Sequence, residues 1–247
     1  EAVGGAAKAI AGSVRIACPD GIGSYFLAPR LIKLVERNHG LNIQLVTGTG
    51  SYSLSKREAD IVIALSCPGE GRIIARKLTD YDLCLYASRA YLDAHGAIRQ
   101  RGDLVGHKFV GYVGDLLQME ELDYLDQVRN GVVPRLESTN LLVQVKATIA
   151  GGGLCVLPVF IARNEPELVP VLSGDICLKR SFWVMVHADY RNQARVRLAT
   201  RFIQEEIRKN EALFRLAPHS EAPEAGAERR RLRIVQTGSA EPQLQPG

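Results

Sequence analysis

The sequence has no long apolar run, and its cysteines follow no recognised pattern. No stretch of about 18 apolar residues occurs in the 247, so a membrane-spanning helix is not expected. The five cysteines are an odd number and lie far apart, and no CxxC pair or Cys/His cluster has the spacing of metal ligands. We therefore expect mostly buried, reduced thiols in a cytoplasmic protein, with no metal and no other cofactor.

Catalytic motifs are also missing. The chain contains no GxSxG turn, no HExxH helix and no GxxxxGK[ST] loop, and its five histidines are scattered without a partner at a fixed offset. The GTGSYS segment at 48–53 holds only part of a GxGxxG pattern and follows the second predicted strand, which argues against a dinucleotide site. Gly151–Gly153 joins a predicted helix to a predicted strand, as a helix stop and tight turn would. These absences indicate a binding protein rather than an enzyme.

The charges of the chain are nearly balanced. Lys and Arg number 31 against 27 Asp and Glu, and three of the arginines lie together at 229–231, so the folded part predicts no strong nucleic-acid surface. From Ala217 onward the chain holds four of its eleven prolines and few large apolar residues, which predicts disorder. The RRRLR segment at 229–233 is expected to be a solvated charge run; contact with nucleic acid or membrane is the alternative.

The spacing of apolar residues predicts alternating strands and helices. Residues 14–18 alternate as a strand does, and residues 24–38 carry apolar side chains at helical spacing. Strands are predicted again at 41–47 and 60–65, with a short polar helix at 51–57, and this order predicts a mostly parallel sheet with right-handed crossovers. Two further strands are predicted at 73–78 and 82–87. The order then restarts in a second α/β unit, with predicted helices at 89–94 and 139–150 and predicted strands at 108–113, 132–136 and 153–157. A strand at 182–187 and a helix at 193–209 are predicted near the end.

Polar or small residues occupy three of the predicted helix starts, at 20–23, 49–51 and 138–140. Helix starts present unpaired N–H groups and a partial positive charge, so the three could converge on one small polar ligand. Ser, Thr, Asp and Asn are equally the residues that cap ordinary helices. Ligand contact and capping therefore both stay open for each helix start.

Six segments, in this order and spacing, resemble the effector-binding region of LysR-type transcriptional regulators. The resemblance covers roughly residues 12–210 and implies an α/β fold of two Rossmann-like lobes joined by two crossover strands, similar to type 2 periplasmic binding proteins. The segments are GSVRIA at 12–17, FLAPRLIKLVERNHGLNIQL at 26–45, READIVIAL at 57–65, IIARKLTDYDLCLYASRAYLDAHG at 73–96, ATIAGGGLCVLP at 147–158, and the FWVMVHADYR strand with the terminal helix.

The resemblance also implies a domain organisation and a function. A small-molecule effector would bind between the lobes and act through a homodimer or homotetramer on a DNA-binding domain, in the cytoplasm. That domain would precede this chain, so we expect the chain by itself not to bind operator DNA. The alternative is a solute-binding protein of a transport system; an enzyme is not expected. The implied parts are the end of a linker helix at 1–11, lobe I at 12–87 plus 190–212, lobe II at 88–189, and a disordered tail at 213–247.

The effector cleft of the family maps onto several turns of this chain. One departure concerns Pro19-Asp20, where many relatives carry a small hydroxyl residue; a carboxylate there would repel an anionic effector or act as a helix cap. Family members also pair antiparallel, which would place the helix at 24–38 against lobe II of a second copy. The predicted effector-binding residues are Asp20, Gly21, Ile22, Thr49, Gly50, Ser51, Ser66, Cys67, Gly111, Tyr112, Ser138, Thr139 and Asn140.

Overall fold

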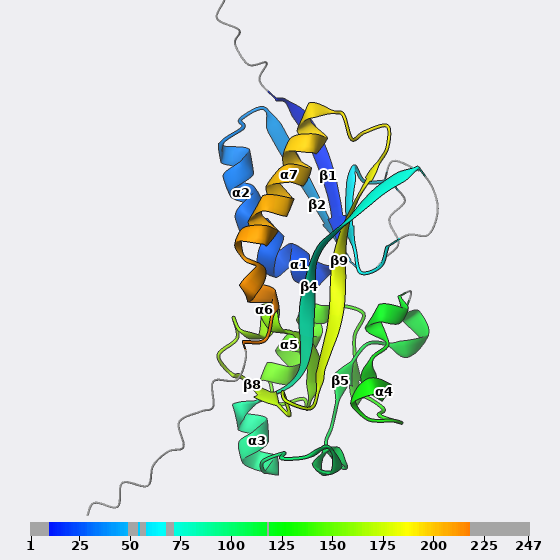
Figure 1. Ribbon diagram of the computed structural model, residues 1–247. Coiled ribbons are helices and arrows are strands. Elements are labelled where there is room, and N and C mark those ends of the chain that lie inside the picture. Colours follow the sequence, from blue (N-terminus) through cyan, green and yellow to red (C-terminus); the bar gives the residue numbers. More distant parts are fainter. Residues whose placement is uncertain (1–9, 49–53, 55–57, 68–71, 118, 218–247) are drawn as a thin grey trace, which may run out of the picture. The chain divides into compact units, whose positions relative to one another are not determined.

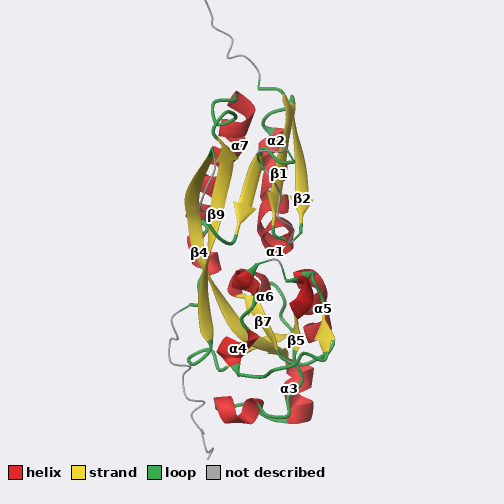
Figure 2. Ribbon diagram, turned by 90° about the vertical axis from the view of Figure 1, so that its right-hand side faces the viewer, coloured by secondary structure: helices red, strands yellow, loops and turns green. Residues whose placement is uncertain are grey.

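The structure, a computed structural model, describes residues 10–48, 54, 58–67, 72–117 and 119–217 (Figure 1). Contacts between Cα atoms divide the chain after Leu216, and the unit Glu1–Leu216 is the one described below. Within it, two α/β lobes are joined by two long strands, β4 (Ile73–Ser88) and β9 (Cys177–His187) (Figure 2). No helix among the described residues is long and apolar enough to cross a membrane.

One lobe is built on the predicted parallel strands. β1 (Gly12–Cys18) pairs in parallel with β2 (Leu41–Thr47) and with β3 (Ile61–Ala64), and β3 pairs antiparallel with the second half of β9. Strand β3 is buried on both faces, as its continuous apolar sequence predicts, whereas β1 buries Val14 and Ile16–Cys18 and exposes Arg15. The carboxyl ends of the three strands lie at one edge, toward the other lobe (Figure 2).

The helix after β1 begins within the helix start predicted at 20–23. It begins at α1 (Asp20–Ile22), continues through a π-helical turn at Gly23–Leu27, and ends with α2 (Ala28–Glu36). Leu31 and Leu34 of α2 are buried against the sheet, as helical spacing predicted. The long helix α7 (Ala194–Lys209) lies beside α2 and buries its own apolar face on the same lobe (Figure 1).

The prediction of two strands at 73–78 and 82–87 is wrong, because β4 is one strand of 16 residues. Its pairing with β9 shifts register between Lys77 and Thr79, and Asp80 and Asp82 interrupt the apolar pattern without ending the strand. The end of β4 also pairs antiparallel with β7 (Cys155–Pro158) and β8 (Leu168–Val171). Because β4 and β9 contribute to both lobes, the lobe boundaries placed at residues 88 and 189 stay a prediction.

Strands in the second lobe differ from prediction at two prolines. The strand predicted at 132–136 is reduced to β6 (Leu136–Glu137), which follows Pro134, and it pairs with β5 (Val110–Gly111). Strand β8 was not predicted because it contains Pro170, which lacks an N–H and is tolerated only at a sheet edge. The helices of this lobe are α3 (Arg89–His95), α4 (Leu125–Val128), α5 (Leu141–Ile149) and α6 (Val159–Ala162), with 3-10 turns at Arg101–Leu104, Gly114–Leu116 and Glu120–Leu122.

The folded unit extends beyond the predicted start of the tail at residue 213. Glu211–Phe214 form a 3-10 turn, and the Phe214 side chain is fully buried. A disordered tail that begins at 213 is therefore wrong for residues 213–216, because an aromatic side chain there completes the core. The tail at 218–247, like the linker end at 1–9 and the helix predicted at 51–57 (apart from Leu54), lies outside the described residues.

The fold brings two of the five cysteines together. Cys84 of β4 lies opposite Cys177 of β9, with their Sγ atoms 3.6 Å apart. Cys18 and Cys155 are buried, as expected, whereas Cys67 is exposed. Among the described residues, no group of His, Cys, Asp and Glu side chains could hold a metal ion.

Candidate effector-binding site

A small cavity lies between the two lobes, where α1 faces α5 and α6. Its volume is about 30 Å³, room for one or two water molecules, whereas metabolite sites typically enclose ~300–1,000 Å³. A metabolite therefore binds here only if the walls move apart. The lining residues are Pro19, Asp20, Gly21, Ile22, Leu65, Tyr81, Leu83, Tyr112, Met119, Leu122, Tyr124, Leu141, Pro158, Phe160 and Phe182.

The Asp20 carboxylate connects the lobes across this cavity. Its Oδ2 accepts a hydrogen bond from the Leu141 N–H at 2.7 Å, and its Oδ1 accepts one from the Gly21 N–H at 2.9 Å. Asp20 therefore caps α5, a helix 121 residues away in sequence, while the residue before α1, Pro19, makes no side-chain cap. Burial raises the pKa of Asp20, and the two N–H bonds oppose that rise.

Gly21 permits the close contact between α1 and the second lobe. A Cβ atom at this position would lie 2.8 Å from both Leu141 Cδ2 and Ile161 Cδ1, closer than real contacts allow. With any larger residue, the ends of the Leu141 and Ile161 side chains or α1 itself would have to shift. A shift of α1 would lengthen the hydrogen bond from Leu141 to Asp20.

The polar residues at 138–140 are used in capping. Asn140 Oδ1 accepts a hydrogen bond from the Val143 N–H at 3.1 Å, and Ser138 Oγ accepts one from the Asn140 N–H at 3.1 Å. The carbonyl of Ser138 accepts a third from Gln144 Nε2. Thr139 and Asn140 are exposed, so this helix start faces solvent apart from the N–H that Asp20 occupies.

The structure brings four of the predicted site residues to the cavity: Asp20, Gly21, Ile22 and Tyr112. The six predicted positions that are described but do not line it are Ser66, Cys67, Gly111, Ser138, Thr139 and Asn140. Thr49, Gly50 and Ser51 lie outside the described residues. The role of all thirteen residues in effector binding stays a prediction.

The match to known proteins assigns this two-lobed chain to a family. Residues 7–208 match the family model of the LysR substrate binding domain. The chain belongs to this family. The match covers both lobes and the strands that join them.

Relatives of this LysR substrate-binding domain are named as transcriptional regulators. The HTH-type transcriptional regulator CrgA of Neisseria meningitidis (serogroup C, strain 8013) is 26% identical over 192 residues, which are 75% of this chain and 64% of that protein. The HTH-type transcriptional activator AaeR of Escherichia coli K12 is 24% identical over 62% of this chain and 50% of its own length. The chain thus spans less than two thirds of these proteins.

Solved structures of the family share the fold. The regulatory domain of CrgA from Neisseria meningitidis superposes with a TM-score of 0.71 at 22% identity, covering 79% of this chain and 98% of that domain. Full-length AphB, a virulence activator of Vibrio cholerae, gives a TM-score of 0.65 at 23% identity over 79% of this chain and 69% of its own. These likenesses confirm the predicted architecture of two lobes and two crossover strands.

Sequence reasoning missed the aromatic walls of this LysR substrate-binding domain. Tyr81 of β4 and Phe182 of β9 stack with ring centroids 4.2 Å apart, and Phe160 lies 6.1 Å from each. Period-2 alternation of Tyr81 and Leu83 would have placed both on one face of a strand, but the predicted break at 79–81 left Tyr81 in a loop. Burial raises the pKa of Tyr112 and of Tyr124, so both hydroxyls stay protonated at neutral pH.

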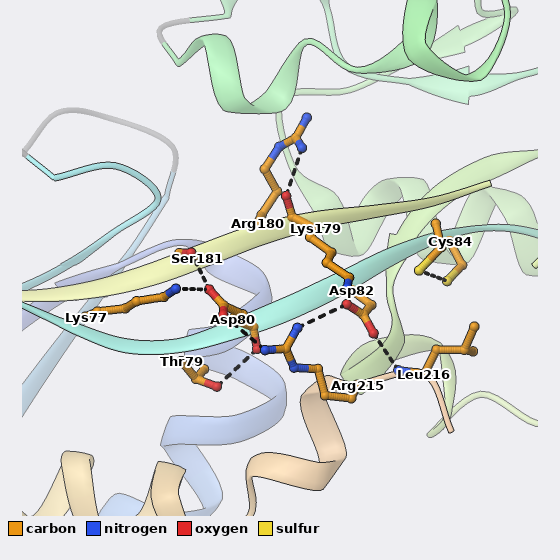
Figure 3. A network of polar contacts seen from close by, with 11 residues as sticks. Lys77, Thr79, Asp80, Asp82, Cys84, Lys179, Arg180, Ser181, Arg215 and Leu216 are labelled. Atoms are coloured by element: carbon orange, nitrogen blue, oxygen red, sulfur yellow. Dashed lines mark hydrogen bonds and ion pairs between the residues drawn. The ribbon is translucent and has the colours of Figure 1, made fainter. Parts of the chain in front are cut away.

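A network of charged side chains lies where the chain passes between the lobes (Figure 3). Asp80 Oδ1 pairs with Lys77 and accepts a hydrogen bond from Ser181 Oγ, both at 2.5 Å, and the Lys77 contact above all lowers the pKa of Asp80 to about 2. Arg215 reaches Asp80 at 3.1 Å and Asp82 at 3.4 Å. These bonds attach the C-terminal segment of the described unit to the crossover strand β4.

Proposed function

We propose that this chain is the effector-binding regulatory region of a LysR-type transcriptional regulator. A small molecule would enter between the lobes, change their relative angle, and so change how a homodimer or homotetramer spaces its DNA-binding domains. The observation that carries the proposal is the cavity between α1 and α5 in a chain that matches the LysR substrate binding domain. An effector shifts the equilibrium between two conformations only if it binds one more tightly than the other. A shift from 1:99 to 99:1 requires binding about 10⁴-fold tighter, or ~5.5 kcal/mol.

Two alternatives receive less support. The relatives named above are transcriptional regulators, which favours a regulator over the solute-binding protein of a transport system. An enzyme on this scaffold would need a nucleophile, base or metal, and the cavity lining offers one carboxylate among apolar and aromatic side chains. We assign contact with promoter DNA to the helix-turn-helix region of such regulators, and a cytoplasmic location follows from that role.

A thermal-shift screen of the chain against a metabolite panel tests the proposal. A true effector at about 100 times its Kd should stabilise the fold by about 2.7 kcal/mol, which for a chain of this size raises Tm by roughly 5–10 °C. Hydrogen exchange with that compound should slow at the amides of Gly21 and Leu141, which lie on opposite walls of the cavity. The proposal fails if no compound shifts Tm, or if every hit protects amides elsewhere.

Oligomerisation through α2 is the second expected property. Ile32 of α2 is 59% exposed while its neighbours Leu31 and Leu34 are buried, so the helix presents an apolar side chain to solvent or to a partner. Ile32→Asp should weaken a homodimer at least about tenfold, measured by sedimentation, because a charge would be buried in the interface. Asn192→Asp, which adds the same charge on an exposed loop, serves as the control; a wild-type monomer at high concentration would contradict the assignment.

A further inference from the structure

The Asp20 carboxylate lies at the positive end of α5. Its Oδ2 accepts the Leu141 N–H at 2.7 Å, and Asn140 Oδ1 accepts the N–H of Val143. A helix start stabilises negative charge through such free N–H groups. A ligand carboxylate in the cavity would find the Leu141 N–H already bonded to Asp20 and would meet the like charge of Asp20. An anionic ligand is therefore disfavoured at this end of the cavity.

The Asp20 charge also lacks a cationic partner. Among the described residues none forms an ion pair with Asp20, and no Lys, Arg or His lines the cavity. The carboxylate accepts the N–H groups of Gly21 and Leu141, which leaves acceptor positions unused because its two oxygens offer about four. A buried charge is unfavourable unless it is paired. The site is thus complementary to a positively charged hydrogen-bond donor.

Aromatic rings form much of the remaining wall. Tyr81, Phe160 and Phe182 contact one another with centroids 4.2–6.1 Å apart, and Tyr112 meets Tyr124 edge to face at 6.2 Å. Ring faces attract organic cations, and the apolar surface around them accommodates hydrocarbon. Together with one carboxylate, this lining suits a compact ammonium ion with an apolar or aromatic body.

We propose that the ligand of this cavity is a small organic amine, held as its ammonium ion against Asp20 with its apolar body among the rings. The proposal rests on the proposed function, since it names the ligand class of the same effector site. Burial raises the pKa of Asp20, and an ammonium partner counteracts that effect by favouring the carboxylate. Because the cavity measures about 30 Å³, entry of an amine with a ring requires its walls to move apart, which links binding to movement of the lobes.

The test compares three probes of nearly equal size by titration calorimetry on the 247-residue chain near neutral pH: benzylamine, benzyl alcohol and benzoate. We expect benzylamine to bind at least about tenfold more tightly than benzoate, with benzyl alcohol between them. Asp20→Asn should weaken benzylamine binding about tenfold or more without weakening that of benzoate. Asp20→Ser, which retains an acceptor for the Leu141 N–H, provides a second variant in case Asp20→Asn folds poorly by circular dichroism.

Asp115→Asn is the matched control, because it removes an exposed carboxylate from a 3-10 turn outside the cavity lining. Binding of benzoate as tightly as benzylamine by the wild-type chain would overturn the amine assignment. Equal losses of affinity for all three probes in the Asp20 variants would also overturn it, since they would indicate that Asp20 has a purely structural role. If none of the three probes binds, the amine assignment is overturned too. The effector-sensing function is tested separately by the metabolite screen, which assumes no ligand class.

Discussion

Phe214→Ala is expected to lower the free energy of unfolding by about 3–5 kcal/mol, the usual cost of removing a fully buried phenylalanine. The Phe214 side chain is 0% exposed, and its ring lies 4.9 Å from that of Phe26 and 5.0 Å from that of Phe160. Those two rings come from the π-helical turn of one lobe and from α6 of the other. Truncation would leave a cavity where the lobes meet, because neighbouring rings on separate elements cannot all collapse into it.

Urea unfolding followed by far-UV circular dichroism measures this effect. Leu116→Ala is the control, since Leu116 is 60% exposed and its truncation should change stability by less than about 0.5 kcal/mol. A loss below about 1 kcal/mol for Phe214→Ala would contradict the packing of the C-terminal segment. The adjacent Arg215 and Leu216, which bond to Asp80 and Asp82 of β4, hold that segment in place (Figure 3).

Gly153→Ala is expected to destabilise the fold by about 2–6 kcal/mol. Gly153 has φ +135°, a conformation that costs a side-chain-bearing residue about 1–3 kcal/mol. A Cβ there would also lie closer than contact distance to the carbonyl of Lys108, a backbone atom that accepts the Leu154 N–H and cannot simply rotate away. Relieving that overlap adds about 1–3 kcal/mol of packing strain.

Gly151→Ala separates the cost of the positive φ from the cost of the overlap with the Lys108 carbonyl. Gly151 has φ +85°, and a Cβ there would meet nothing within 4 Å, so only the conformational cost applies. In chemical denaturation of both variants, the free energy of unfolding of Gly153→Ala should be at least about 1 kcal/mol lower than that of Gly151→Ala. Equal losses would show that the contact with Lys108 is not tight in solution. The sequence predicted a helix stop and tight turn at this triplet but could not distinguish its members.

Prediction of the candidate site from sequence was partial for a physical reason. The start of α1 was predicted from the turn after a strand, and Asp20, Gly21 and Ile22 do line the cavity. Tyr81 and Phe182 were missed because their role depends on pairing between β4 and β9, strands about a hundred residues apart. Periodicity reports that one face of an element is buried, but it does not report what buries it.

The two possibilities raised for Asp20 turn out to be compatible. Capping was one and ligand contact the other, and the carboxylate caps α5 of the opposite lobe while it also lines the cavity. A sequence-based cap assignment considers only the helix that follows, within three or four residues. A cap supplied from 121 residues away is visible only once the lobes are folded against each other.

Local spacing and the order of segments were enough to predict the α/β class, the parallel strands β1–β3 with their helix, and the family. Four features became visible only in the folded chain: β4 is one continuous strand, Cys84 meets Cys177, Phe214 completes the core, and Asp20 joins the lobes. Each of these depends on contacts between residues far apart in the chain. Such contacts form only when the whole unit folds, since their energies depend on burial that local sequence does not encode.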